Sequence, residues 1–153
     1  MRCFFIEQCP TPLEWGILRK SAGWSIATNA NFKIAAQNSL YAISAYVNDE
    51  IVGMGRVIGD GILCFYIQDL VVTEIYQGHG VGGTMLQLLL RYIRIHAAEN
   101  AVIGLFASLN KEKFYEKYGF VCRPNPTKGC GMYIEPGMLK QFSLSQYPSY
   151  IEL

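Results

Sequence analysis

Three apolar runs follow one another with only short turns between them, and this feature constrains the fold more than any other. The runs span residues 41–47, 51–58 and 62–72. The turns between them are Asn48-Asp49 and 59–61, a Gly-Asp-Gly sequence. Turns of this length join antiparallel neighbours, because a parallel pair needs a crossover of a dozen or more residues. The sequence therefore predicts a mostly antiparallel sheet in this part of the chain.

Helical patterns lie on both sides of this meander. Thr11 to Glu14 forms a capping box with proline at the first helical position, which predicts a helix that ends near Gly23. A weaker helix is predicted over 31–38. A longer one is predicted over 81–96, with one apolar face formed by Val81, Met85, Leu88, Leu89, Tyr92 and Ile93. Helices of this amphipathic kind pack on a sheet, so the fold class is mixed α/β.

Shorter patterns complete the chain. A strand is predicted over 2–8 and a buried strand over 101–106. A charged helix is predicted over 110–118 with Asn110 as its N-cap, and Gly119 ends it as a C-terminal cap. Further strands are predicted at 120–122 and 131–134, whereas the segment 136–153 gives no assignable pattern.

Length, charge and cysteines limit the possible functions. The 153 residues suffice for one domain, 1–153, and a net charge of +1 predicts neither a nucleic-acid nor a membrane partner. The apolar stretches are interrupted every few residues, so none is expected to span a membrane. The five cysteines show no C-x-x-C spacing and the two histidines do not cluster with them, so no metal site is expected. Reduced thiols favour a cytoplasmic location.

The sequence YQGHGVGGTML, from Tyr76 to Leu86, places four glycines within six positions just before the longest helical pattern. Glycine lets the backbone approach an anion, and the free N–H groups at a helix start bind phosphate. Three phosphate-binding patterns are possible. Gly78, Gly80 and Gly83 spell G-x-G-x-x-G, residues 78–84 resemble a P-loop without its lysine, and Gln77 begins Q-x-x-G-x-G.

The order of elements separates these patterns. A dinucleotide-binding unit begins with a strand that enters the glycines almost directly and has parallel neighbours. Here an antiparallel meander precedes the glycines and a loop separates them from residue 72. A P-loop needs the lysine that reaches the terminal phosphates. The context therefore favours the third pattern.

This third pattern, followed some forty residues later by FYEKYGF at 114–120, resembles the GNAT superfamily of N-acetyltransferases. The resemblance covers roughly residues 41–120. It implies a sheet splayed between the strand ending at Val72 and the strand beginning at Ala101. The sequence FYIQDLVV before the glycines is similar to a branch that acetylates aromatic ethylamines.

The resemblance also implies a co-substrate, acetyl-coenzyme A, and the residues that hold it. The pyrophosphate would lie on the backbone of the turn, and the pantetheine arm along the preceding strand. Tyr115 would give its phenolic proton to the coenzyme A sulfur, with an aromatic core residue as the alternative. Many members carry Asn where this chain has Ser108, so Ser108 is a candidate contact. The implied cofactor-binding set is Leu70, Val71, Val72, Gln77, Gly78, His79, Gly80, Val81, Gly82, Gly83 and Ser108.

Asp69 is the candidate general base. Under strict alternation it shares a strand face with apolar residues, where an unpaired carboxylate is costly. It is therefore either partnered, and structural, or turned toward the cleft by a bulge. The aromatic-amine acetylators that the chain resembles carry an aspartate at the matching place.

Two functions remain from the sequence. The first is acetyl transfer from acetyl-coenzyme A to a primary amine, expected to be a small molecule, by a monomer or homodimer. The alternative is a module that binds acyl-coenzyme A as a sensor, without turnover. Protein N-termini and lysines are also acetylated by similar folds, and the sequence does not separate these acceptors.

Overall fold

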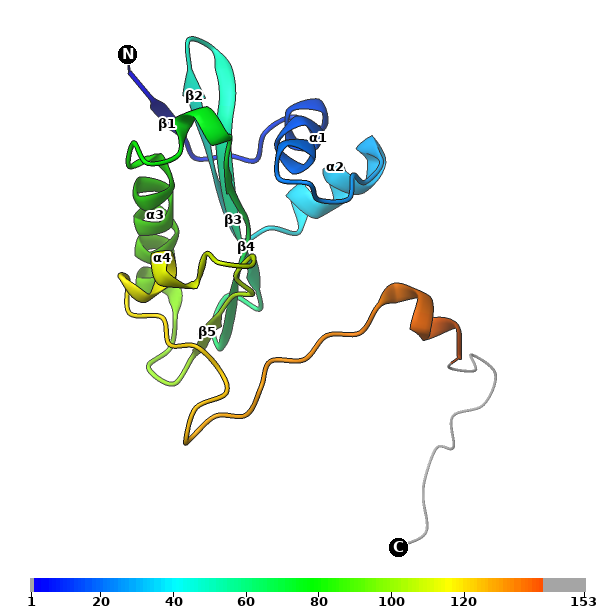
Figure 1. Ribbon diagram of the computed structural model, residues 1–153, viewed down its shortest axis with the longest axis vertical. Helices are drawn as coiled ribbons and strands as arrows, with labels where there is room; N and C mark the ends of the chain where they lie inside the picture. The colour runs from blue at the N-terminus through cyan, green and yellow to red at the C-terminus, as the bar shows by residue number, and fades with distance from the viewer. Residues whose placement is uncertain (1, 142–153) are drawn as a thin grey trace, which may run out of the picture. The chain divides into compact units, whose positions relative to one another are not determined.

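The computed structural model describes residues 2–141, which divide into two units (Figure 1). The first unit ends at Phe106, and the second begins at Ala107. The prediction that 1–153 forms a single domain stays a prediction.

A five-stranded sheet forms the centre of the first unit. Its strands lie in the order in which they occur in the chain. Its first three strand pairs are antiparallel and the last pair is parallel, which confirms the predicted mixed, mostly antiparallel sheet. The strands are β1 (Phe4–Ile6), β2 (Tyr41–Val47), β3 (Glu50–Gly59), β4 (Cys64–Val72) and β5 (Val102–Gly104).

Helices cover both faces of this sheet. Helix α3 (Val81–His96) lies on one side, and α1 (Pro12–Ser21) and α2 (Asn29–Gln37) lie on the other (Figure 1). Met85, Leu86, Leu89 and Ile93 are fully buried on α3. On the opposite face the core consists of Trp15, Leu18, Phe32, Met54 and Val71. The apolar stripe predicted for 81–96 thus packs on the sheet, although Leu88 and Tyr92 are only half-buried and Leu86 is buried in addition to the predicted positions.

The capping box predicted at the start of α1 is present. The Thr11 hydroxyl accepts a hydrogen bond from the Glu14 backbone N–H at 3.3 Å, and the Glu14 carboxylate accepts one from the Thr11 N–H at 2.8 Å. These reciprocal bonds satisfy two N–H groups that a helix start leaves without partners. The helix ends at Ser21, two residues before the predicted Gly23.

Strands β4 and β5 separate beyond a short paired stretch. Their register joins Cys64 to Val102 and Tyr66 to Gly104, and there β5 ends. From Ile67 to Val72, β4 has no strand partner on that edge among residues 2–141. This is the splay that the resemblance implied. The prediction that the later strand is buried is wrong, because Val102 is 67% exposed.

The second unit holds less regular structure than the sequence predicts. Helix α4 (Glu112–Glu116) is shorter than the predicted 110–118, and Asn110 adopts a left-handed conformation with φ of 64° instead of capping it. The N-cap is Lys111. The segments 120–122 and 131–134 form no strand, and their apolar side chains are exposed except for that of Phe120, which is half-buried. Beyond the 3-10 helix Pro136–Gln141, the chain lies outside the described residues.

No helix within residues 2–141 combines the length and apolar character needed to cross a bilayer. The cytoplasmic location predicted from the cysteines stays a prediction.

Candidate active site

The glycine turn between β4 and α3 has a backbone that only glycine adopts easily. Gly78 has φ of 78° and Gly80 has φ of 86°, both in the left-handed region where a Cβ crowds the backbone. A Cβ added at either position would meet no heavy atom within 4 Å. The glycines are therefore required by the backbone conformation, while open space remains next to them.

The N-terminus of α3 opens onto this space. Gly80 is the N-cap residue, and no side chain of the described residues caps the helix. The Thr84 N–H bonds to the Gly80 carbonyl at 2.9 Å, so the N–H groups of Val81, Gly82 and Gly83 come before the first intrahelical bond. Free N–H groups at a helix start, together with the helix dipole, favour an anion. The residues present thus fit a phosphate group.

The turn is braced against the end of β4. The Gln77 side-chain amide donates a hydrogen bond to the Val72 carbonyl at 2.8 Å. The His79 Nδ1 lies 2.9 Å from the Gln77 carbonyl, and since a carbonyl only accepts, Nδ1 carries the proton in this contact. Gln77 therefore joins two parts of the implied cofactor-binding set, the turn and the strand. His79 is an exposed side chain that reinforces the turn.

A bulge interrupts β4 at Asp69. Met54 pairs with Val71, but Arg56 pairs with Gln68, so a single residue of β3, Gly55, opposes two residues of β4. Asp69 has φ of 53°, a left-handed conformation. The bulge breaks the alternation assumed from the sequence, which placed Asp69 on one face with Ile67 and Phe65.

The faces follow from what each side chain contacts. A Cβ added at Gly55 would meet Leu89 of α3, so Gly55 points to the α3 side, and Val57 and its partner Ile67 follow by alternation. Asp69 instead contacts Arg19 of α1. The predicted common face for Ile67 and Asp69 is therefore wrong, because the bulge turns Asp69 to the α1 side.

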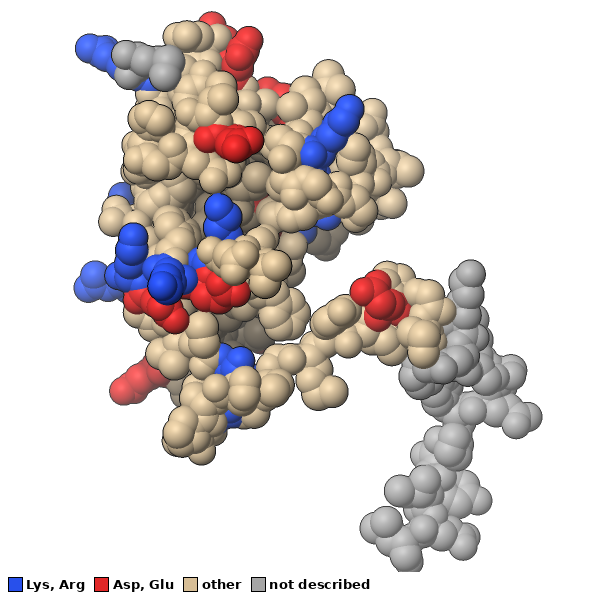
Figure 2. Space-filling view, in the orientation of Figure 1, with Lys and Arg blue, Asp and Glu red and all other residues tan. Residues whose placement is uncertain are grey.

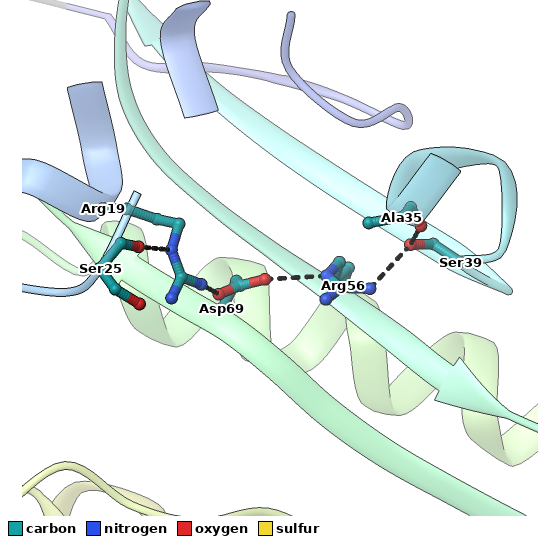
Figure 3. A network of polar contacts seen from close by, with 6 residues as sticks. All are labelled: Arg19, Ser25, Ala35, Ser39, Arg56 and Asp69. Carbon is teal, nitrogen blue, oxygen red and sulfur yellow. Dashed lines mark hydrogen bonds and ion pairs between the residues drawn. The ribbon is translucent and has the colours of Figure 1, made fainter. Parts of the chain in front are cut away.

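Asp69 is the centre of a buried ionic network (Figure 3). Its carboxylate, 1% exposed, accepts Arg19 Nη1 on Oδ1 and Arg56 Nε on Oδ2, the latter at 2.9 Å. Arg19 also donates to the Ser25 carbonyl at 2.7 Å, and Arg56 donates to the Ser39 hydroxyl at 3.2 Å. The two guanidinium groups lie over the rings of Trp24 and Trp15, respectively.

This geometry bears on the prediction that Asp69 is the general base. Both carboxylate oxygens already accept charged donors, and a base needs a lone pair within reach of the proton that it removes. The two possibilities left open by the sequence, a partner and a bulge, both occur. The geometry favours the structural alternative for Asp69.

Tyr66 marks the point where β4 and β5 separate. Its ring packs edge-on against Phe106 with 5.5 Å between centroids. Burial raises the pKa of the Tyr66 phenol, and a backbone hydrogen bond at Phe106 partly opposes the shift. The phenol is thus a neutral hydroxyl at physiological pH.

Tyr115 and Ser108 belong to the second unit. The Tyr115 ring is half-buried and packs edge-on against Phe114 at 5.0 Å and against Phe120 at 5.9 Å. The Ser108 carbonyl accepts a hydrogen bond from the Lys111 N–H at 3.0 Å. The aromatic packing that the sequence suggested around Tyr115 is present. Its role as proton donor stays a prediction, as does the contact of Ser108 with the cofactor.

Arg19 and Arg56 are the residues that the sequence analysis missed. Arg56 is a lone charge in the apolar run 51–58, and Asp69 is a lone carboxylate in the next run. Two lone opposite charges in neighbouring strands are a signal for a pair. Arg19 gave no such signal, because it lies fifty residues from Asp69 in the chain.

Figure 2 shows the charged side chains on one face of the molecule. Lysine and arginine side chains are mixed with aspartate and glutamate over the face drawn in Figure 2. Within residues 2–141, no three histidine, cysteine, aspartate or glutamate side chains come together in an arrangement that could hold a metal ion.

A GNAT acetyltransferase domain model matches residues 24–135, a stretch that contains the splayed strand, the glycine turn and Tyr115. The chain belongs to the GNAT family. In a crystal structure, a Staphylococcus aureus protein of unknown function, described as a probable acetyltransferase, is 33% identical with a TM-score of 0.80. The match covers 88% of this chain and 99% of that one. A GNAT-family acetyltransferase from Streptococcus pneumoniae, 24% identical with a TM-score of 0.72, has the same fold.

Curated relatives include N-acetyltransferases named ycf52. The protein from Pyropia yezoensis is 33% identical over 117 residues, which is 74% of this chain and 66% of that protein. A protein from Prochlorococcus marinus, named ycf52-like, is 30% identical over 116 residues and is matched over 63% of its length. The chain thus spans about two thirds of these relatives. None of the relatives described here supports the finer resemblance to acetylators of aromatic ethylamines.

Proposed function

We propose that this chain is an acetyl-coenzyme A-dependent N-acetyltransferase that acts on a primary amine, with a small molecule as the acceptor. The observation that carries the proposal is the turn at Gly78 and Gly80, which leads into an uncapped helix start beside open space. A turn that only had to reverse the chain would need one or two glycines. This chain uses four.

Different parts of the site would bind different parts of acetyl-coenzyme A. The backbone N–H groups from Gln77 to Gly83 would hold the pyrophosphate, and Gln77 fixes the turn to Val72. Among residues 2–141, no strand pairs with β4 between Ile67 and Val72 on the side away from β3. Backbone groups on that side would bind the pantetheine arm, in the way that they would bind an added strand.

Acetyl transfer needs an acyl donor, a group that polarises its carbonyl, and an acid that protonates the departing thiolate. Bound acetyl-coenzyme A supplies a thioester carbonyl that a neutral amine attacks. The backbone groups near Leu70 to Val72 would polarise that carbonyl, as an oxyanion hole does. As the carbon–sulfur bond breaks, Tyr115 would donate its phenolic proton to the departing sulfur. The proton lost by the attacking nitrogen would pass to water, from which Tyr115 would be protonated again.

The name of one further relative is a reason to test protein amines as acceptors alongside small amines. A soybean protein named histone acetyltransferase TAP1 is 32% identical over 83 residues, 54% of this chain and 35% of that protein. Lysine side chains and peptide N-termini therefore belong in the same screen as small amines.

The experiment measures thiol release from acetyl-coenzyme A with a panel of small amines, lysine peptides and free N-terminal peptides. We expect amine-dependent release, with the acetylated product identified by mass, and the largest kcat/KM for a small amine. The control without amine gives the rate of hydrolysis. Binding of acetyl-coenzyme A without release on any amine would favour the sensor. A larger kcat/KM for lysine peptides would replace the small-molecule acceptor.

A further inference from the structure

We propose that Asp69 is a positioning residue: held by Arg19 and Arg56, it keeps the left-handed bulge of β4 in place and thereby fixes the backbone at Leu70 and Val71. The proposal rests on the proposed function, in which this backbone polarises the thioester carbonyl. It replaces the assignment of Asp69 as a base.

The bulge needs something to hold it. A non-glycine residue with positive φ is uncommon, and it persists only when its surroundings determine it. At Asp69 the φ is 53°, in the middle of a strand where one neighbour, Gly55, cannot pair with both Asp69 and Leu70. The edge toward β5 offers no strand pairing from Ile67 to Val72 among the described residues. The backbone ladder alone therefore leaves this stretch weakly defined.

Side-chain contacts on both faces of the sheet hold the bulged stretch of β4 in place. On the α1 side, Asp69 is fixed by Arg19 and Arg56 through its two separate oxygens. On the α3 side, a Cβ at Gly55 would meet the Leu70 and Leu89 side chains at 2.9 and 3.0 Å, so Leu70 packs over Gly55. Consecutive residues are thus held on opposite faces, which fixes the rotation of the peptide group between them.

The two arginines are themselves held by other elements. Arg56 extends from β3 between Asp69 and Ser39, with its guanidinium 5.1 Å from the Trp15 ring centroid. Arg19 leaves α1 between Asp69 and the Ser25 carbonyl, with a side chain only 21% exposed (Figure 3). Arg19 and the Trp15 ring next to Arg56 both belong to α1, so the bulge is held from the α1 side of the sheet.

The test neutralises Asp69 without changing its size. Asp69→Asn keeps a residue that tolerates the left-handed region, but an amide cannot accept charged donors on both of its ends. We expect kcat to fall roughly 10- to 100-fold, because small displacements of polarising groups have effects of this order. We expect the Kd for coenzyme A, which lacks the acetyl carbonyl, to change less than about threefold, and the pH profile of kcat/KM to keep its shape.

Matched variants separate positioning from folding. Asp60→Asn also removes a carboxylate from the same hairpin, at the exposed turn where Asp60 accepts the N–H groups of residues 62–64, and it should keep the parental kcat. Arg19→Lys keeps the charge but not the planar fork, and we expect a smaller loss of kcat than in Asp69→Asn. Since both act through one contact, the double variant should lose less than the product of the two single losses.

Three results would overturn the proposal. A parental kcat in folded Asp69→Asn with a lowered Tm would make the network purely structural. A flattened rising limb of the kcat/KM profile would restore Asp69 as the base. If Asp69→Asn does not fold, a parental kcat in Arg19→Lys would serve as the refutation. Failure of the parent protein to acetylate any amine would instead refute the proposed function, because every comparison here is a ratio to the parent.

Discussion

Replacement of Gly80 by alanine tests the proposed phosphate site most directly, since the structure offers a matched control for its effect on folding. Gly80 has φ of 86°, and Gly23, at the end of α1, has φ of 72°. An added Cβ would meet nothing within 4 Å at either position. Both substitutions therefore place a methyl group on a left-handed backbone in open space, and they differ only in location.

The expected loss of stability is the same for both variants. A left-handed conformation costs an alanine about 1–2 kcal/mol relative to glycine. In a domain of this size, 1 kcal/mol lowers Tm by roughly 2–4 °C, so each variant should melt about 2–8 °C below the parent. Differential scanning calorimetry measures both values.

The expected loss of coenzyme A binding is different. The methyl group of Gly80→Ala would occupy the space beside the N–H groups of Val81 and Gly82, where the pyrophosphate is proposed to lie. The loss of one hydrogen bond to a charged group costs about 1.5–3 kcal/mol, which is roughly a 10- to 150-fold higher Kd. Gly23→Ala should keep the parental Kd. Titration calorimetry that gave the two variants the same affinity would show that the phosphate site is elsewhere.

Three further predictions concern the acid, the nucleotide and the core. Tyr115→Phe should lower kcat roughly 10- to 1,000-fold with little change in the Kd for coenzyme A, whereas Tyr118→Phe in the same segment should keep the parental kcat. A parental kcat in Tyr115→Phe would rule out Tyr115 as the acid. NAD should raise Tm less than acetyl-coenzyme A does at equal concentration, and an equal shift would restore the dinucleotide hypothesis. Gly53→Ala should destabilise the protein by about 1–3 kcal/mol in urea, since its Cβ would lie 2.8 Å from the Val71 carbonyl and 2.9 Å from Met85; an unchanged midpoint would contradict this packing.

The meander and α3 could be predicted because their signals are local. The two short turns determine which strands are neighbours, and β2 and α3 begin and end at the predicted residues. A period of 3.6 residues sustained over four turns leaves little choice about the buried face of α3. The glycine turn was also predictable, because the residues with positive φ are themselves glycines.

The later part of the chain could not be predicted in the same way. Short apolar runs such as 120–122 and 131–134 become strands only when a neighbouring edge pairs with them, and that depends on contacts far along the sequence. The predictions for Val102 and Asn110 failed for the same reason. An apolar residue is buried only if another element packs on it, and a residue suited to capping caps a helix only if the helix starts next to it. Pattern strength there was a poor guide to structure.

Asp69 shows where reasoning from the sequence ends within a well-predicted element. The register of the hairpin places Arg56 opposite Gln68, one residue from Asp69, so the neighbourhood of the two charges followed from the turn at 59–61. Strict alternation would still put Arg56 and Asp69 on opposite faces of the sheet, and no ion pair would form. The bulge brings them to one face, and no glycine marks it in the sequence, because a left-handed residue in a strand need not be a glycine. An aspartate is among the few other residues that accept this conformation, and its charge attracts the two arginines. A lone carboxylate in an apolar strand, with a lone arginine almost opposite, is thus better interpreted as a sign of a bulge than as a free base.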